Sequence, residues 1–234
     1  MYTSVLLKLS GEMLLGESDG VGFDTKRATW IAGEVKKVAD QGCKIAIMVG
    51  GGNLARGAQL EHRGITRVTG DYVGMMATMM NALLLADIFN HVGVPTRALS
   101  CIAADEAIDL YTHRRASNHL DKGRVVIIAG GTGRPYLTTD TGAVNFALDL
   151  GCEVVLKATK VDGVYDKDPA TSPDAIKFEK VDYRHALEND NIKVMDKAAI
   201  GLAMEHHLPV IVFDLMQPDN IAKAARQSAG TLIS

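Results

Sequence analysis

Glycine-rich turns with basic residues beside them are the features of this chain best suited to bind phosphate groups. Gly50, Gly51 and Gly52 follow the apolar stretch Ile45–Val49, and Arg56 comes shortly after them. Glycine has no Cβ, so it reaches left-handed backbone angles and lets main-chain N–H groups approach an anionic oxygen closely. Arg56 would add fixed positive charge. The same triplet also suits a tight turn from a strand into a helix, so two interpretations stay open, a phosphate cradle and a plain turn.

Lys8 is a second candidate for contact with phosphate. It lies near the end of the apolar run Val5–Leu9, just before Ser10 and Gly11. A lysine in a buried strand is costly unless an anion lies beside it, which favours a phosphate ligand. The alternative is a lysine on an edge strand whose ammonium group reaches water.

A second glycine-rich loop, from Gly130 to Asp140, follows the apolar run Arg124–Ala129 and is rich in hydroxyl groups. Hydroxyl and main-chain N–H groups at the start of a helix suit a phosphate. Asp140 does not fit that picture alone, because a carboxylate repels phosphate unless it holds lysines or a metal ion there. Its presence favours catalysis over simple packing.

Charged residues also follow the apolar strand that ends at Lys157. They include Thr159, Asp162 and Asp168, and they would lie outside the carboxyl ends of parallel strands, where α/β proteins bind ligands. Asp71, before a long helical pattern, has two interpretations. It is either the N-cap of that helix or an acceptor of hydrogen bonds from ribose hydroxyls.

Alternating helices and strands must position these residues. A helix capped by Asp24 or Thr25 and stopped by Gly42 separates two buried strands, which predicts a β-α-β unit with parallel strands. We expect a mostly helical stretch from Ala104 to Leu120 as well. The pattern predicts an α/β fold, and no linker or repeat divides residues 1–234, so we expect a single domain.

Composition excludes several classes of function. The chain has 234 residues, with 25 Lys plus Arg against 28 Asp plus Glu and a formal net charge of -3, so no basic field exists to hold nucleic acid. Its three cysteines are widely separated, which indicates reduced thiols in a cytoplasmic protein. We find no signal peptide and no run of about 18 apolar residues that would span a membrane. The adjacent His206 and His207 do not share a helix face, which argues against a metal pair.

Five motifs, taken together and in this order, closely resemble those of bacterial uridylate kinases, which belong to the amino-acid kinase superfamily. They are K-L-S-G at Lys8–Gly11, G-G-G-N-L-A-R-G at Gly50–Gly57, G-D-Y-V-G-M-M-A-T at Gly70–Thr78, G-T-G-R-P-Y-L-T-T-D at Gly131–Asp140 and K-A-T-K-V-D-G-V-Y-D-K-D-P at Lys157–Pro169. The similarity covers essentially the whole chain.

The resemblance implies a three-layer α/β/α sandwich around a mainly parallel sheet, and direct in-line transfer of the γ-phosphoryl group of ATP to UMP, giving UDP and ADP. The catalytic residues it implies are Lys8, Arg56 and Asp140, with Asp140 orienting Lys8. The implied ATP contacts are Lys8, Leu9, Ser10, Gly11, Gly52, Arg56, Thr159, Tyr165 and Asp168. The implied UMP contacts are Gly51, Asp71, Thr132, Gly133, Arg134, Pro135, Tyr136, Leu137, Thr138 and Thr139. Lys157 and Asp196 are two further candidates.

The resemblance also implies partners. Mg²⁺ would bridge the ATP phosphates and be held mainly through them rather than by a protein metal site. Bacterial members are typically homohexamers that GTP activates and UTP inhibits, and the loop Gly16–Gly22 is similar to a segment linked to GTP activation.

The chain departs from the family pattern in the second loop, where Arg134 replaces a common asparagine and Tyr136-Leu137 replaces a common Phe-Phe pair. Arg134 would either add a phosphate contact or point to solvent. Two alternatives are a kinase of the same superfamily acting on a carboxylate or carbamate, and a non-catalytic nucleotide or oxyanion binding protein on the same fold.

Overall fold

A nine-stranded sheet forms the centre of the computed structural model, which describes residues 1–16, 22–55, 64–189, 192 and 194–234. Its strands are β1 (Ser4–Leu9), β2 (Lys44–Val49), β3 (Thr96–Ser100), β4 (Asp109–Leu110), β5 (Val125–Ala129), β6 (Val154–Thr159), β9 (Lys180–Val181), β10 (Val210–Asp214) and β11 (Thr231–Ile233). They lie in the order β4-β3-β5-β2-β1-β6-β10-β11-β9. Every pair is parallel except β10 with β11, which confirms the predicted mainly parallel sheet.

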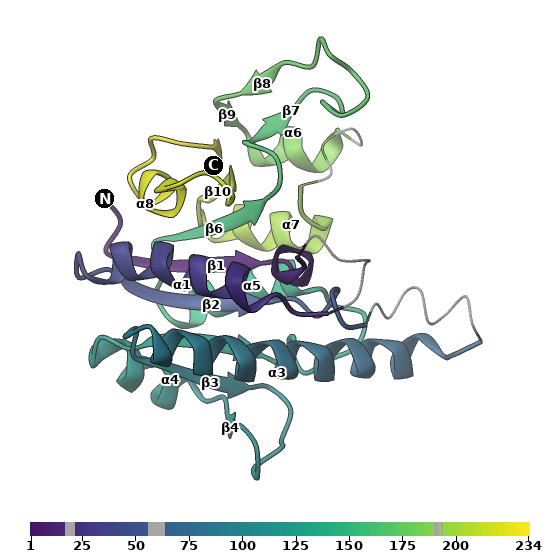
Figure 1. The fold of residues 1–234 in the computed structure, drawn as a ribbon. Helices are drawn as coiled ribbons and strands as arrows, with labels where there is room; N and C mark the ends of the chain where they lie inside the picture. The colour runs from purple at the N-terminus through teal and green to yellow at the C-terminus, as the bar shows by residue number, and fades with distance from the viewer. Residues whose placement is uncertain (17–21, 56–63, 190–191, 193) are drawn as a thin grey trace.

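Helices cover both faces of the sheet, so the fold is the predicted three-layer sandwich (Figure 1). One face packs on α1 (Thr25–Ala39), α3 (Arg67–His91) and α8 (Asn220–Ala225), with the short 3-10 helix η1 (Gly11–Leu14) beside them. The other face packs on α4 (His113–Asp121), α5 (Thr139–Asp149), α6 (Tyr183–Glu188) and α7 (Lys197–Glu205).

The side-chain alternation of the central strands decides which residues face which layer. In β1, Val5, Leu7 and Leu9 are buried against α1 and α3, whereas Leu6 belongs to the core on the opposite face. Because successive side chains of a strand point to opposite faces, Lys8 lies on the same face as Leu6. The sequence therefore directs Lys8 toward the layer that contains α5.

Two predicted helix limits are wrong. The long helix α3 begins at Arg67, and its N-cap is Thr66, whose side chain accepts a hydrogen bond from the Thr69 N–H group. Asp71 lies inside the helix and is not its cap. The stretch from Ala104 to Leu120 is helical only from His113, because a bridge between Ala104 and Ile108 and the short strand β4 come first.

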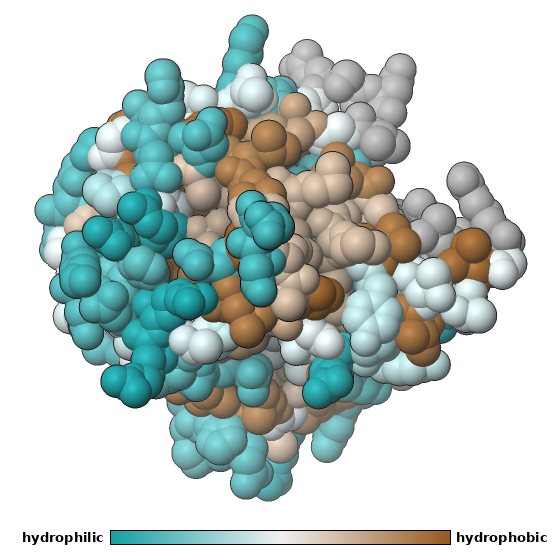
Figure 2. All heavy atoms as spheres, turned by 90° about the horizontal axis from the view of Figure 1, so that it is seen from below, coloured by the Kyte–Doolittle hydropathy of each residue, from teal (hydrophilic) through white to brown (hydrophobic). Residues whose placement is uncertain are grey.

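Helix α3 is long and apolar enough to cross a membrane by length and composition alone. One side of it is buried in the core against the sheet, as in a core helix of a soluble protein. Its other side carries exposed apolar side chains, and Figure 2 shows apolar residues gathered on this face of the molecule. The exposed apolar residues of α3 are Val68, Tyr72, Met76, Met80, Leu83 and Leu84.

A small antiparallel pair extends from the carboxyl end of β6. It consists of β7 (Val164–Tyr165) and β8 (Lys177–Phe178), which lie with α6 at the top of Figure 1, far from β4 at the bottom. The second strand falls within residues 174–181, where alternation predicts a hairpin arm.

Candidate active site

Lys8, Asp140 and Lys157 form a buried cluster at the carboxyl end of the central strands. Lys8 and Lys157 are register partners on the neighbouring strands β1 and β6, and Asp140 lies in the first turn of α5. Lys8 Nζ lies 2.7 Å from Asp140 Oδ1, and Lys157 Nζ donates to Oδ2 at 2.5 Å. The side chains of Lys8, Asp140 and Lys157 are 9%, 14% and 11% exposed. This geometry excludes the edge-strand interpretation of Lys8.

The charges of the cluster hold Asp140 ionised. Burial alone raises the pKa of Asp140, but the positive charges of Lys8 and Lys157 outweigh it, so the pKa lies below its ordinary value. Burial and the charge of Lys8 lower the pKa of Lys157, and Asp140 offsets only part of that shift. Two ammonium groups share one carboxylate, so the cluster carries one excess positive charge. Such a site favours a phosphoryl group.

The main chain of the first glycine turn, Gly50–Gly52, packs directly against the main chain of the loop after β1, which contains Gly11. A Cβ on Gly11 would lie 2.6 Å from Gly52 N, and a Cβ on Gly50 would lie 2.9 Å from Gly11 N. Gly50, Gly51 and Gly52 have no positive φ angle, so close approach, and not left-handed backbone, explains the triplet. In the second turn Gly130, Gly131 and Gly133 do have positive φ angles, of 76°, 56° and 73°.

Two polar residues of α3 anchor both glycine turns, and neither was predicted from the sequence. Asn81 Nδ2 donates to Gly50 O at 2.7 Å, and Thr78 Oγ1 accepts from Gly130 N at 2.7 Å. Asn81 also exchanges hydrogen bonds with Asn53, the residue after the triplet. Thr78 and Asn81 are three residues apart, so they share one helix face. A buried Asn inside an apolar helical pattern is the signal that would have found this anchor.

One cavity, of about 150 Å³, lies between the two glycine turns and α3. Four residues predicted to bind UMP line it: Gly51, Asp71, Leu137 and Thr139. Its remaining lining residues are Ala55, Gly74, Met75, Thr78 and Gly131. The structure therefore brings together residues from three separate motifs.

The other residues of the second loop that were predicted to bind UMP are not among those that line this cavity. Thr132 makes hydrogen bonds with the main chain of Arg134, which is exposed, and Tyr136 is 67% exposed with a positive φ of 67°. Gly133 and Pro135 lie in the same stretch and are partly buried. Thr138 caps α5, accepting from the N–H groups of Asp140 at 3.0 Å and Thr141 at 3.4 Å.

Asp196 stabilises the Thr138 cap of α5. It is the N-cap of α7, accepting from Ala199 N at 2.9 Å, and it also accepts hydrogen bonds from the hydroxyl groups of Thr138 and Thr141. Through Thr138 it supports the turn that carries Asp140. The structure thus places Asp196 beside the active cluster.

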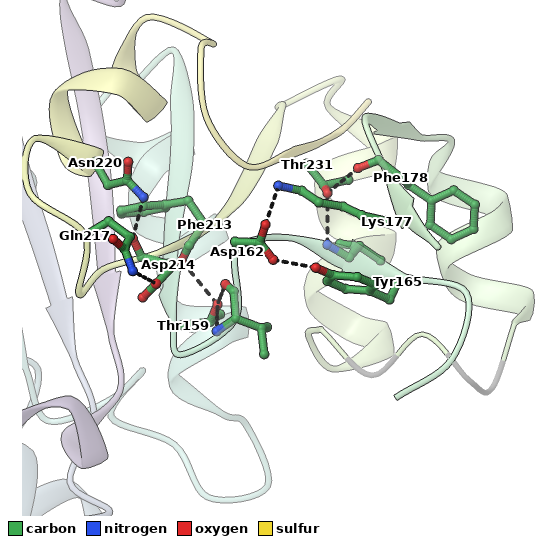
Figure 3. Close-up of polar contacts among 12 residues, drawn as sticks. Thr159, Asp162, Tyr165, Lys177, Phe178, Phe213, Asp214, Gln217, Asn220 and Thr231 are labelled. Carbon is green, nitrogen blue, oxygen red and sulfur yellow. Dashed lines mark hydrogen bonds and ion pairs between the residues drawn. The ribbon is translucent and has the colours of Figure 1, made fainter. Parts of the chain in front are cut away.

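A second cavity, of about 350 Å³, lies beside β7, where Tyr165 and Asp168 line its wall. The Tyr165 hydroxyl donates to Asp162 Oδ1 at 2.6 Å, and Lys177 Nζ lies 2.9 Å from Asp162 Oδ2 (Figure 3). Thr159 is not among the lining residues. Its hydroxyl lies within hydrogen-bond distance of the main-chain carbonyls of Val161, in its own turn, and of Phe213, in β10. These contacts fix the strand ends beside the cavity.

Leu9 and Ser10, two of the residues predicted to contact ATP, do not line either cavity. The Leu9 side chain is fully buried in the core, so its main chain alone is available to a ligand, and Ser10 is the N-cap residue of η1. Arg56 lies outside the described residues, as do residues 17–21 of the loop Gly16–Gly22.

Metal ligands are not clustered in the part of the chain that the structure describes. There, no three His, Cys, Asp or Glu side chains come together around one point. Asp140 is bound to two lysines. The donor set therefore fits a metal ion that arrives with a phosphate ligand better than one held by the protein alone.

Comparison with known proteins places these features in context. The sequence profile described as the Amino acid kinase family matches residues 3–214. A protein named uridylate kinase, from Dichelobacter nodosus (strain VCS1703A), is 45% identical over 233 residues, covering 99% of this chain and 96% of that protein. The crystal structure of UMP kinase from Bacillus anthracis matches with a TM-score of 0.95 at 36% identity, covering 100% of this chain and 96% of the other. That of UMP kinase from Ureaplasma parvum matches with a TM-score of 0.92 at 30% identity, covering 100% and 99%.

Proposed function

This chain belongs to the amino acid kinase family, and from that premise we propose that it acts as a single domain to transfer the γ-phosphoryl group of ATP to UMP. It is an ATP-dependent nucleotide kinase that phosphorylates UMP, and the products are UDP and ADP.

The arrangement of the two cavities about the lysine cluster is the observation that carries the proposal. One cavity adjoins the turns after β2 and β5, and the other adjoins the segment after β6. Lys8 and Lys157 extend from β1 and β6, which are neighbours in the sheet, and β1 also pairs with β2. Two phosphate-bearing substrates entering from the two cavities would therefore meet at the excess positive charge. We assign UMP to the smaller cavity and ATP to the larger.

The reaction asks for alignment and charge neutralisation rather than for a protein base. The phosphate of UMP is already an anionic nucleophile, so no side chain has to remove a proton from it. Lys8 would neutralise charge on the transferred group, and Asp140 would hold the ammonium groups of Lys8 and Lys157 in place. Arg56 is proposed as a second cation on the donor side. Main-chain N–H groups of the glycine turns would bind the remaining phosphate oxygens.

We assign the divalent ion to Mg²⁺. When bound, it would neutralise charge on the ATP phosphates. The lack of clustered metal ligands among the described residues supports holding it mainly through those phosphates.

A coupled ADP-release assay with UMP, CMP and acetylglutamate as acceptors tests the activity. We expect turnover with UMP, and activity with acetylglutamate alone would refute the proposal in favour of an amino-acid kinase. Tight binding of UMP and ATP in calorimetry with no UDP formed would instead support the non-catalytic alternative. Lys8 and Asp140, which that alternative does not need, speak against it.

Self-association and regulation belong to the same proposal. We propose a cytoplasmic homohexamer that GTP activates and UTP inhibits. The exposed apolar side of α3 supports self-association, because a contiguous apolar surface of this kind marks an interaction site. Light scattering gives the mass of the assembly, and repeating the ADP-release assay with GTP or UTP measures the effector response.

A further inference from the structure

Arg67, Asp71 and Tyr136 form a cluster at the rim of the smaller cavity. The Arg67 Nε–H group is shared between both carboxylate oxygens of Asp71, at 2.9 Å each. Asp71 Oδ2 also accepts from Tyr136 N at 2.8 Å, and the Arg67 guanidinium lies 5.5 Å from the centroid of the Tyr136 ring. The Asp71 hydrogen bond and the Arg67 cation–π contact thus join the first turns of α3 to the second glycine loop, and the Arg67–Asp71 pair links these two contacts within the helix.

Tyr136 needs these contacts because its backbone is strained. Its φ of 67° lies in the left-handed region, which a bulky side chain rarely adopts. Its ring is on the surface, since the residue is 67% exposed, so core packing does not hold the bend. The hydrogen bond to Asp71 and the cation over the ring are the contacts placed to offset this strain.

The bend determines where the next residues go. Leu137 and Thr139 follow Tyr136 closely, and both line the cavity together with Asp71. Asp71 is therefore both a wall of the cavity and the anchor of the loop opposite. Arg67 does not line the cavity, and it acts on it only through Asp71 and Tyr136.

We propose that Arg67 is a positioning residue for the acceptor nucleotide. It fixes the carboxylate of Asp71 and holds the loop at the Tyr136 bend, so that the cavity is formed before the acceptor binds. A carboxylate has about four acceptor positions, so Asp71 can still take a hydrogen bond from a ribose hydroxyl while Arg67 and Tyr136 N–H are bound. This inference rests on the proposed UMP kinase activity.

Steady-state kinetics of Arg67→Ala test the proposal. We expect KM for UMP to rise about tenfold, with KM for ATP and kcat changed by less than about twofold, because preorganisation of one site affects the binding of its own ligand. Lys36→Ala is the matched control, since Lys36 and Asp40, the C-cap residue of α1, form an exposed i,i+4 pair at 3.0 Å. An equal rise in both KM values, or no rise beyond that of Lys36→Ala, would overturn the proposal.

A double variant tests the route of the effect. If Arg67 acts through Asp71, then adding Arg67→Ala to Asp71→Ala changes KM for UMP little further. Full additivity of the two changes would show that Arg67 does not act through Asp71 and would refute its role in fixing that carboxylate.

Limited proteolysis provides a measurement that needs no substrate. Chymotrypsin cleaves after exposed Tyr136 and Leu137, and we expect faster cleavage there in Arg67→Ala than in Lys36→Ala, because the loop is released. Unchanged cleavage would refute the proposal that Arg67 holds the loop at Tyr136, even if the enzyme phosphorylates UMP. If the unmodified protein fails to phosphorylate UMP while cleavage is still faster in Arg67→Ala, the proposed function is refuted, but the role of Arg67 in holding the loop is supported.

Discussion

Replacing Asp140 by Asn leaves two buried ammonium groups without their anion. Removing one partner of a buried ion pair costs about 3–5 kcal/mol. We expect a loss near the lower limit, about 3 kcal/mol, because the Asn carbonyl still accepts from one lysine, and Lys157, whose pKa burial already lowers, can give up its proton. For a chain of this length that corresponds to a fall in Tm of roughly 6–12 °C.

Thermal unfolding of Asp140→Asn measures this loss, with Asp121→Asn as the control. Lys44 and Asp121 also lie 2.7 Å apart, but their side chains are 49% and 64% exposed, so we expect a change below about 1 kcal/mol. The loss in Asp140→Asn should become smaller as the pH rises, because burial lowers the pKa of Lys157 and a neutral Lys157 needs no anion beside it. ATP should raise the Tm of the variant more than that of the unmodified protein, because its phosphates replace the missing anion.

Two results would contradict the holding role of Asp140. One is a Tm equal to that of the unmodified protein at neutral pH without nucleotide. The other is an ATP-induced rise in Tm that is no larger in the variant. Either would mean that Asp140 does not hold the charges of Lys8 and Lys157 in the free protein.

Three further predictions concern the turns and the thiols. Gly51→Ala should raise KM for UMP more than KM for ATP in steady-state kinetics, because the added Cβ would lie 2.6 Å from a carbonyl oxygen of α3 at the smaller cavity. Asn81→Leu removes the amide that donates to the Gly50 carbonyl group, and we expect a loss of about 1–3 kcal/mol in denaturant unfolding. An unchanged midpoint would argue against the anchor. Burial raises the pKa of Cys43 and Cys152 to about 11 and that of Cys101 to about 12. We therefore expect slow reaction with a thiol reagent at pH 8 until the protein is unfolded, and fast reaction of the native protein would refute this.

The parallel sheet could be predicted because its signals are local. Each signal is contained in a short stretch of sequence: unbroken apolar runs indicate strands, and Gly42, with a φ of 84°, lies just beyond the C-cap of α1. The unfavourable position of Asp140 among residues predicted to bind phosphate also predicted that lysines or a metal ion lie beside it. Lys8 does lie next to Asp140, because the alternation of side chains along β1 points Lys8 toward the layer that contains α5, and Asp140 lies in the first turn of that helix.

The errors come from contacts that join distant segments. Thr66 caps α3 because its side chain accepts from Thr69 N, whereas Asp71 lies inside the helix and is bound to Arg67 and to a loop 65 residues away. No residue near Asp71 in the sequence predicts its contact with that loop. Asn81 was overlooked for the same reason, because its partner is the glycine turn after β2.

The anchoring of both glycine turns on α3 limits how chains of this kind can change in length. An insertion or deletion of one residue between Arg67 and Thr78 would rotate the start of the helix by about 100° relative to the turns. Arg67 would then face away from the cavity while Thr78 and Asn81 kept their partners. Substitutions can accumulate along this helix, but gaps in an alignment should fall outside the segment from Arg67 to Asn81.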